Sequence, residues 1–283
     1  LAIFIDSEIW PNLITDIKKK KIPLLLINGR ITKKSFLRWN LFNSFARKIF
    51  GKFDLCIAAN MQSENYLKKL GVKKIKFIGN LKFSQSENEK IILDKNFKEF
   101  ISSKIVWCAS STHNTEEQFC GLVHKKLSKK YKNLLTIIIP RHIERATEIE
   151  NDLKKMNLKV HIHEPKQKIN SNTDMYIVNS YGKTKSFYSI CKNVFLGGSL
   201  INRGGQNPLE ATRYGCNIIH GPNVTNFSEI YTFLKKNKIS TKILNVNKMA
   251  ITLNKLFSKK TGEKKIKKKL NEIGQNILKH TYR

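Results

Sequence analysis

The sequence predicts an α/β protein with two Rossmann-like domains. Short apolar, β-branched runs alternate with longer amphipathic segments, which is the pattern of parallel strands joined by helices. A polar segment at residues 84–90 has too few apolar side chains to join a core, and the alternation restarts after it. We therefore predict domains at residues 1–83 and 84–283, with two sheets facing a cleft and ligands at the carboxyl ends of the strands.

The expected elements follow from this periodicity. In the first domain we expect strands at about 1–5, 23–28, 54–59 and 74–78 and helices at about 11–20, 33–50 and 62–70. In the second we expect strands at about 104–109, 134–139, 159–163, 174–178, 193–196 and 217–220, and helices near 114–130, 143–156, 184–191, 207–215 and 226–236. A lysine-rich amphipathic segment at residues 262–283 should pack as a closing helix.

The net charge of +32 suggests an anionic partner. A strongly basic surface attracts polyanions, so a nucleic-acid-binding protein is one interpretation. Only 8 of the 53 basic residues are Arg, however, and the 45 Lys are spread along the whole chain, as is typical of solvated surfaces. We therefore expect an anionic substrate or lipid as the partner, and no nucleic acid.

Cysteine usage and hydropathy indicate the compartment. The five cysteines lack both CxxC spacing and the density of a disulfide scaffold, which favours a reducing, cytoplasmic environment. No apolar run approaches the ~20 residues that a membrane-spanning helix needs. Because residues 1–5 already have the pattern of a buried strand, we expect the chain to be incomplete at its N-terminus, with any anchoring segment upstream.

A glycine-rich run, residues 197–210, follows the strand expected at 193–196. The pair Gly197-Gly198 would let the backbone turn tightly and approach a ligand, and Gly204-Gly205 leads to a helix that starts near Asn207-Pro208. Free backbone N–H groups there would bind a phosphate, and Glu210 would accept hydrogen bonds from ribose hydroxyls. The alternative is a glycine-rich loop with a capped helix and no ligand.

Two further strand ends in this domain carry polar side chains. Arg141 follows the strand at 134–139, where its guanidinium would suit a phosphate, and His142 is either a ligand or a helix-start residue. Ser110 and Thr112 belong to a hydroxyl cluster before a helix, where such residues are ordinarily N-caps. Because all these strand ends should meet at one edge of the sheet, we expect a single shared site.

The first domain offers weaker signals. Glu8 lies between a strand and a Pro-started helix, so it either faces the cleft or satisfies the helix dipole. Residues 32–52 mix aromatic and basic side chains, which is a pattern of membrane-surface helices and also of helices that pack on a core. His161 and His163 alternate along a strand, and no His/Cys cluster has metal-ligand spacing, so we expect no metal.

Taken together, the motifs resemble 3-deoxy-D-manno-octulosonic acid (Kdo) transferase in order and spacing. The segments that carry the resemblance are Glu-Ile-Trp-Pro-Asn at 8–12, Asn-Gly-Arg at 28–30, Gly-Asn-Leu-Lys-Phe at 79–83, Ala-Ser-Ser-Thr-His at 109–113, Pro-Arg-His at 140–142, the run at 197–210 and Gly-Pro-Asn-Val-Thr-Asn-Phe at 221–227. The resemblance extends nearly end to end. It implies the GT-B glycosyltransferase architecture, with an incomplete N-terminal domain.

The resemblance also implies a reaction. It is the inverting transfer of Kdo from CMP-Kdo to a lipid A precursor in lipopolysaccharide core biosynthesis, without metal or cofactor. The protein would work at the cytoplasmic face of the bacterial inner membrane, as a peripheral protein on an anionic surface or anchored by an upstream segment. The CMP moiety would be held by Arg141, Ser199, Asn207 and Glu210, the donor's charged groups would be reached by Lys82, and Glu8 would be an active-site carboxylate. The predicted donor-binding set comprises Lys82, Ser110, Thr112, Arg141, His142, Gly198, Ser199, Asn207 and Glu210.

Three departures from the family pattern bear on activity. Gln206 stands where the family usually has His, and Ala211-Thr212 replaces Pro-Ala. The family's general base is a Glu in a Gly-rich turn that would precede Leu1, so we expect this chain to bind donor poorly and to transfer little Kdo. The alternative function is another GT-B enzyme, a hexosyltransferase or a UDP-sugar epimerase, which nucleotide preference would distinguish.

Overall fold

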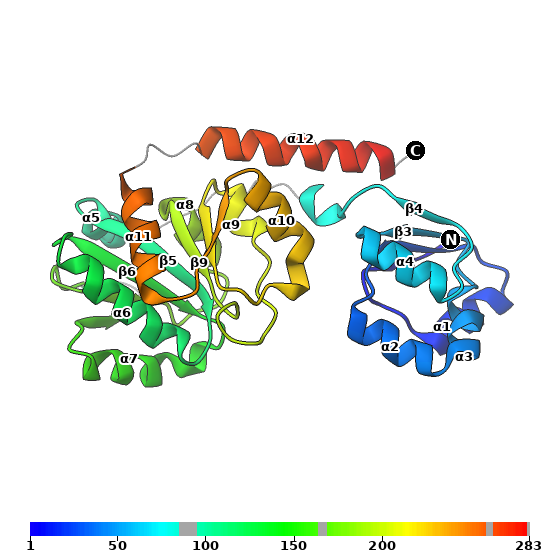
Figure 1. Cartoon of the computed structure of the whole chain (residues 1–283), viewed down its shortest axis with the longest axis horizontal. Coiled ribbons are helices and arrows are strands. Elements are labelled where there is room, and N and C mark those ends of the chain that lie inside the picture. The colour runs from blue at the N-terminus through cyan, green and yellow to red at the C-terminus, as the bar shows by residue number, and fades with distance from the viewer. Residues whose placement is uncertain (85–94, 164–168, 259–262, 282–283) are drawn as a thin grey trace. The chain divides into compact units, whose positions relative to one another are not determined.

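The computed structural model describes residues 1–84, 95–163, 169–258 and 263–281. The chain forms two compact units, Leu1–Ser86 with Leu270–Arg283, and Glu87–Lys269 (Figure 1). The polar segment expected at 84–90 lies, apart from Ser84, outside the described residues. Each unit contains a parallel sheet, so the predicted α/β class is confirmed.

The first unit has a four-stranded sheet in the order β1-β2-β3-β4. Its elements are β1 (Ala2–Ile5), α1 (Pro11–Lys19), β2 (Leu24–Gly29), α2 (Lys33–Leu41), α3 (Asn43–Phe50), β3 (Leu55–Ala58), α4 (Met61–Lys69), β4 (Ile75–Phe77) and the 3-10 turn η1 (Leu81–Ser84). All four predicted strands are confirmed. The prediction of one helix over 33–50 is wrong, because Phe42 leaves the helical region (φ −116°, ψ 55°) and separates α2 from α3.

The last helix, α12 (Glu263–Thr281), confirms the helix expected near the end of the chain. Leu270 and Ile277 are buried, and Leu270–Arg283 belongs to the first unit. A Cβ at Gly274 would lie 2.5 Å from the carbonyl oxygen of Phe83 in η1, so only glycine allows this close approach. The helix is therefore packed against η1.

The second unit has a seven-stranded parallel sheet in the order β11-β10-β9-β5-β6-β8-β7. Its elements are α5 (Lys95–Ile101), β5 (Ile105–Thr112), α6 (Glu116–Ser128), β6 (Leu134–Pro140), η2 (Ile143–Arg145), α7 (Ala146–Lys155), β7 (Val160–Ile162), β8 (Met175–Ile177), α8 (Thr184–Ile190), β9 (Asn193–Leu196), α9 (Leu209–Arg213), β10 (Asn217–His220), η3 (Thr225–Phe227), α10 (Ser228–Lys236), β11 (Ser240–Lys242) and α11 (Val246–Phe257). The six predicted strands are confirmed, whereas α5, β11 and α11 were not expected from the sequence pattern.

The strand order creates a switch point between β5 and β9. From β5 the chain builds one half of the sheet through β6, β7 and β8, and then crosses back so that β9 pairs with the other side of β5. Helices α6, α7 and α11 pack on one face through a continuous apolar core. In open α/β sheets the connections at such a point diverge, and ligands bind at the carboxyl ends of the two strands. The ends of β5 and β9 are therefore where the fold favours a site.

No helix within the described ranges is both long enough and apolar enough to cross a membrane.

Candidate donor-nucleotide site

The carboxyl ends of β5 and β9 are joined by one buried side chain, Glu116 in the first turn of α6. Its carboxylate accepts hydrogen bonds from the backbone N–H groups of Gly198 (2.7 Å), Ser199 (3.1 Å) and Leu200 (3.0 Å), and from that of His113 (3.1 Å). The side chain is 1% exposed. The expectation that these loop N–H groups are free for a phosphate is therefore wrong for residues 198–200.

Gly197 and Ser199 complete this internal arrangement. A Cβ at Gly197 would lie 2.4 Å from the carbonyl oxygen of Ser111, so the glycine is required by the backbone of β5. The Ser199 hydroxyl is buried, donates to the carbonyl of Leu196 and accepts from the N–H of Gly221 (2.8 Å). Two of the predicted donor-binding residues, Gly198 and Ser199, thus lie in this loop. Their described hydrogen bonds are internal and determine the shape of the loop.

The end of β5 does not contain the N-caps expected there. Thr115 occupies the position before α6 with φ 77°, and its side chain does not cap the helix, whose start is instead stabilised by Glu116. Ser110 and Thr112 are buried, and the Ser110 hydroxyl hydrogen-bonds to the Tyr188 hydroxyl at 2.8 Å. The β5–β6 register shifts between Ser110 and Thr112, and Ser111 has φ 55°. This irregular edge lies where the switch point favours a ligand.

Positive charge gathers beside the loop. Burial lowers the pKa of His113, and the neighbouring basic side chains of Arg203, His142, Arg141 and Arg145 lower it further. The rings of His113 and His142 are 6.0 Å apart, and Arg141 is tied to the β5 end through its N–H, which donates to Thr112 (2.9 Å). Two segments, one following β6 and one following β9, therefore place basic side chains around His113, which itself follows β5.

Several of these groups have no partner within the described part of the chain. The buried Nε2 of His113 has no hydrogen-bond partner there, and the guanidinium groups of Arg141 and Arg203 form no ion pair. Arg145, in contrast, is paired with Glu117 (3.0 Å) and Glu148 (3.2 Å). The uncompensated charge makes this edge a favourable environment for an anion.

The remaining predicted residues of this unit lie around the start of α9. Asn207 accepts a hydrogen bond from the N–H of Leu209 (3.1 Å) through its side-chain oxygen, and α9 begins at that residue. Glu210 is half-buried in the first turn and lies close enough to Tyr188 for its charge to raise the pKa of that hydroxyl, although burial is the larger cause. Glu210 and Ser110 are thus both close to Tyr188.

The first unit holds a separate polar group at the ends of β1 and β2. Lys82 of η1 forms an ion pair with Asp6 (3.0 Å), whose other carboxylate oxygen accepts a hydrogen bond from the Asn28 side chain. Asp6 and Asn28 both have positive φ, 56° and 55°, which is a strained conformation often found at functional sites. Glu8 is exposed and accepts a hydrogen bond from the indole of Trp10 (2.8 Å).

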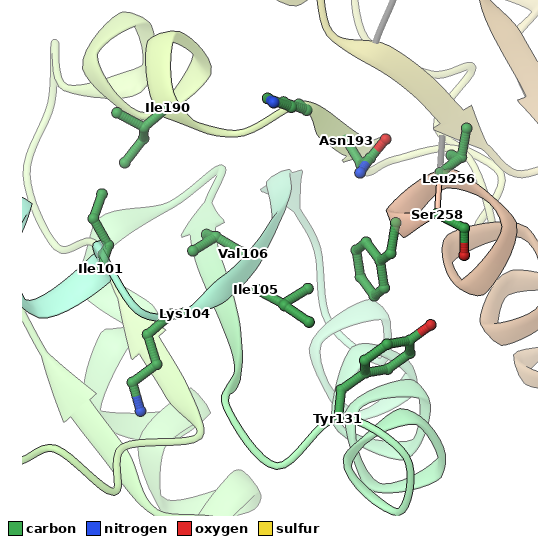
Figure 2. A pocket seen from close by; sticks show the side chains of 11 residues that line it. Ile101, Lys104, Ile105, Val106, Tyr131, Ile190, Asn193, Leu256 and Ser258 are labelled. Atoms are coloured by element: carbon green, nitrogen blue, oxygen red, sulfur yellow. The ribbon is translucent and has the colours of Figure 1, made fainter. Parts of the chain in front are cut away.

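A pocket elsewhere in the second unit belongs to the opposite edge of the sheet. Figure 2 shows it lined by Ile105 and Val106 at the start of β5, with Asn193 at the start of β9 and Tyr131 beside them. It therefore lies at the amino ends of the strands, away from the switch point. Among the described residues, no group of three or more His, Cys, Asp and Glu side chains could hold a metal ion.

Sequence reasoning missed Glu116, His113 and Arg203 as members of this site. Glu116 contacts residues that follow it by 82–84 positions, and no local pattern indicates such a pairing. Arg203 was visible only as part of the glycine-rich run. One local feature could have indicated Glu116. It is an acidic residue in the first turn of a helix, where a carboxylate is favourably placed to accept hydrogen bonds from backbone N–H groups.

Solved structures with similar folds identify the architecture. The C-terminal CMP-Kdo binding domain of WaaA from Acinetobacter baumannii matches with a TM-score of 0.53 and 24% identity, over 65% of this chain and 93% of that one. Anabaena Alr3699/HepE in complex with UDP-glucose matches with a TM-score of 0.55 and 12% identity, over 95% of this chain and 74% of that one. At these identities the likeness concerns the fold, which is that of GT-B glycosyltransferases.

Sequence relatives identify the family. The family model described as 3-deoxy-D-manno-octulosonic-acid transferase (kdotransferase) matches residues 1–85. The 3-deoxy-D-manno-octulosonic acid transferase of Haemophilus influenzae is 29% identical over 98% of this chain, and that of Aquifex aeolicus is 30% identical over 96% of it. The chain spans 65% and 69% of the length of these two curated relatives. It belongs to the Kdo transferase family, as its motifs suggested.

Replacing Arg203 by Ala tests the electrostatics of the site. Burial and the charge of Arg203 both lower the pKa of His113 from its ordinary value of 6.5, so removing that charge should raise the pKa. NMR titration of the His113 ring protons measures it. Lys126→Ala, which removes a charge at the other end of α6, should leave the value unchanged. An unchanged His113 pKa in Arg203→Ala would show that Arg203 does not act on this site.

Proposed function

We propose that this chain forms the donor-binding part of an enzyme that transfers Kdo from CMP-Kdo to a lipid A precursor in lipopolysaccharide biosynthesis. The observation that carries the proposal is the group of uncompensated cations around His113, at the switch point of the sheet. CMP-Kdo carries a phosphate and a sugar carboxylate, so both of its charged groups would be attracted there. Membership of the family supplies the identity of the sugar.

The reaction makes a specific demand on these cations. The acceptor hydroxyl gives its proton to a general base while its oxygen attacks the anomeric carbon of Kdo, the bond from that carbon to the phosphate oxygen breaks, and CMP leaves with the additional negative charge. Attack from the opposite face inverts the configuration. Arg141, His142 and Arg203 would stabilise the charge on the departing phosphate, in the way that a metal ion does in other transferases. This is the physical basis for a metal-independent mechanism.

Other residues are assigned by their position. Glu210 would accept hydrogen bonds from the ribose hydroxyls, and Asn207 would set the start of α9 beside it. Ser110 and Thr112 are buried, so their contribution would be to the shape of the β5 edge. In the first unit, Lys82 would reach a charged group of the donor, and Glu8 would be an active-site carboxylate.

A GT-B enzyme that uses a UDP-sugar is the second candidate. The fold is shared with a protein whose structure contains UDP-glucose. A glycine-rich loop and a ribose-binding Glu suit either pyrimidine nucleotide. The two candidates therefore differ in the base that the site accepts.

Nucleotide preference is the test of this proposal. CMP should raise the unfolding temperature of the chain by several degrees, because a ligand at 100 times its Kd adds about 2.7 kcal/mol of stability. UDP should have little effect. Arg141→Ala should abolish most of the CMP shift, and Lys126→Ala should retain it. A larger shift with UDP would favour the hexosyltransferase or epimerase. No nucleotide effect together with salt-sensitive DNA binding would favour a nucleic-acid-binding protein.

The surface formed by α2 and the start of α3 supports an anionic membrane as a partner. Phe36 and Trp39 of α2 pack against the core, whereas Leu37, Leu41, Phe42 and Phe45 are 53%, 78%, 71% and 49% exposed and form an apolar surface that the core does not cover. A hollow beside them is lined by Lys33, Lys34 and Arg38 together with Leu37, Asn40 and Leu41. Apolar side chains ringed by cations are typical of interfacial helices. We propose that this surface binds the cytoplasmic face of the inner membrane.

Vesicle binding tests this surface. The chain should bind vesicles that contain phosphatidylglycerol and bind phosphatidylcholine vesicles weakly. Replacing both Leu41 and Phe42 by Ser should weaken binding at least about tenfold, because two apolar side chains no longer insert into the lipid. Leu122→Ser, which changes a similarly exposed residue of α6, is the matched control. Equal binding by the double variant and the control would exclude the α2–α3 surface as the membrane contact.

A further inference from the structure

Glu116 places a buried negative charge at the centre of a site that attracts anions. Its two carboxylate oxygens accept four backbone hydrogen bonds, one from the turn that precedes α6 and three from the loop that follows β9. Burial raises the pKa of the Glu116 carboxyl, and the four hydrogen bonds act in the opposite direction. Charge-assisted bonds of this kind are about twice as strong as neutral ones, so a carboxylate is well held here.

The N–H groups of residues 198–200 converge in the manner of a phosphate-binding loop. Successive N–H groups that point at one spot create a cavity for an anion. In this chain the anion is supplied internally by Glu116. A phosphate of the donor would therefore have to bind beside this cavity, where His113, Arg141 and Arg203 lie.

The restraint at Glu116 extends to the rest of the loop. The carbonyl of Gly198 accepts from the N–H of Gly205 (2.9 Å), and the carbonyl of Ser199 accepts from that of Asn223 (2.9 Å). A Cβ at Gly198 would lie 3.3 Å from the His113 ring and 3.4 Å from the Gln206 amide nitrogen, so these side chains flank it. Glu116 therefore holds the start of segment 198–206, and the side chains of Asn223, Asn226 and Tyr231 donate to carbonyl groups further along it.

We infer that Glu116 is a positioning residue for the loop at residues 198–206. As an internal anion, it fills the amide cavity of residues 198–200, holds the start of the loop and directs the donor phosphate to the cations around His113. The inference rests on the proposed function for the identity of the ligand. The part that concerns the loop itself is independent of any ligand and can be measured on the free chain.

Glu116→Gln, with Glu117→Gln as a matched control, tests the inference. Gln keeps the size of the side chain but replaces one acceptor oxygen by an NH₂ group that faces N–H donors. Glu117 is the adjacent residue, is 2% exposed, and is paired with Arg145 rather than with the loop. Both variants lose a buried carboxylate in the same helical turn, so a general loss of stability would affect them similarly.

Hydrogen exchange is the first readout. In Glu116→Gln the amides of segment 198–206 should exchange at least about tenfold faster, whereas peptides from β6 and α7 keep the wild-type rate. Glu117→Gln should leave the loop rate unchanged. An unchanged loop in Glu116→Gln, or a uniform increase across the whole unit, would overturn the inference. If Glu116→Gln does not fold, Glu116→Asp retains the charge and should give a partial increase confined to the same segment.

CMP affinity is the second readout and separates the two proposals. Glu116→Gln should raise the Kd for CMP about tenfold or more, and Glu116→Asp should recover part of the loss. Glu117→Gln, which removes the carboxylate paired with Arg145, should not raise the Kd. Wild-type chain that binds no CMP, with the loop effect intact, would refute the proposed function and leave the loop assignment standing. Normal CMP affinity in Glu116→Gln would refute the positioning role.

Discussion

Four backbone N–H groups from two distant segments donate to one buried carboxylate, and the carboxyl edge of the second unit is organised around it. Because Glu116 satisfies these donors, the backbone of residues 198–200 has none left for a phosphate. Attraction of an anion must then come from side chains, and basic side chains from the ends of β6 and β9 are close to His113 at the end of β5. The glycine-rich loop was expected to bind a phosphate through its backbone N–H groups. It is better described as a support for the cationic side chains around His113.

The two units use polar groups differently. In the first, the carboxylate of Asp6 is paired with Lys82 and Asn28 across the ends of two strands, and both backbone turns are strained. In the second, Ser199 and Ser110 are bonded internally, while Arg141 and Arg203 form no ion pair within the described ranges. The second unit therefore has cations that are available to an anion, whereas the Asp6 carboxylate of the first unit already has partners.

Hydrophobic periodicity was sufficient to predict most strands and helices, because most of them have an apolar face that repeats locally. The prediction failed where an element is determined by tertiary contacts or consists of polar residues. Phe42 breaks a helix that its neighbours' pattern continues, and β11 is a Ser-Thr-Lys strand without apolar alternation. For α11, the Asn245 side chain that accepts from the Lys248 N–H was a recognisable start signal. The strand ends of the site were predictable from topology, whereas the pairing of Glu116 with residues 198–200 was not, because nothing local encodes a contact over 82 positions.

The location of the nucleotide is the central claim, and an NMR titration of the isotope-labelled chain with CMP tests it most directly. The account predicts that backbone shifts concentrate at residues 113, 141–142 and 203–210, with a rise in the pKa of His113 as the phosphate approaches. Residues that line the pocket at the amino ends of β5 and β9, such as Val106 and Tyr131, should not respond. Shifts centred on that pocket, or none near His113, would contradict the account.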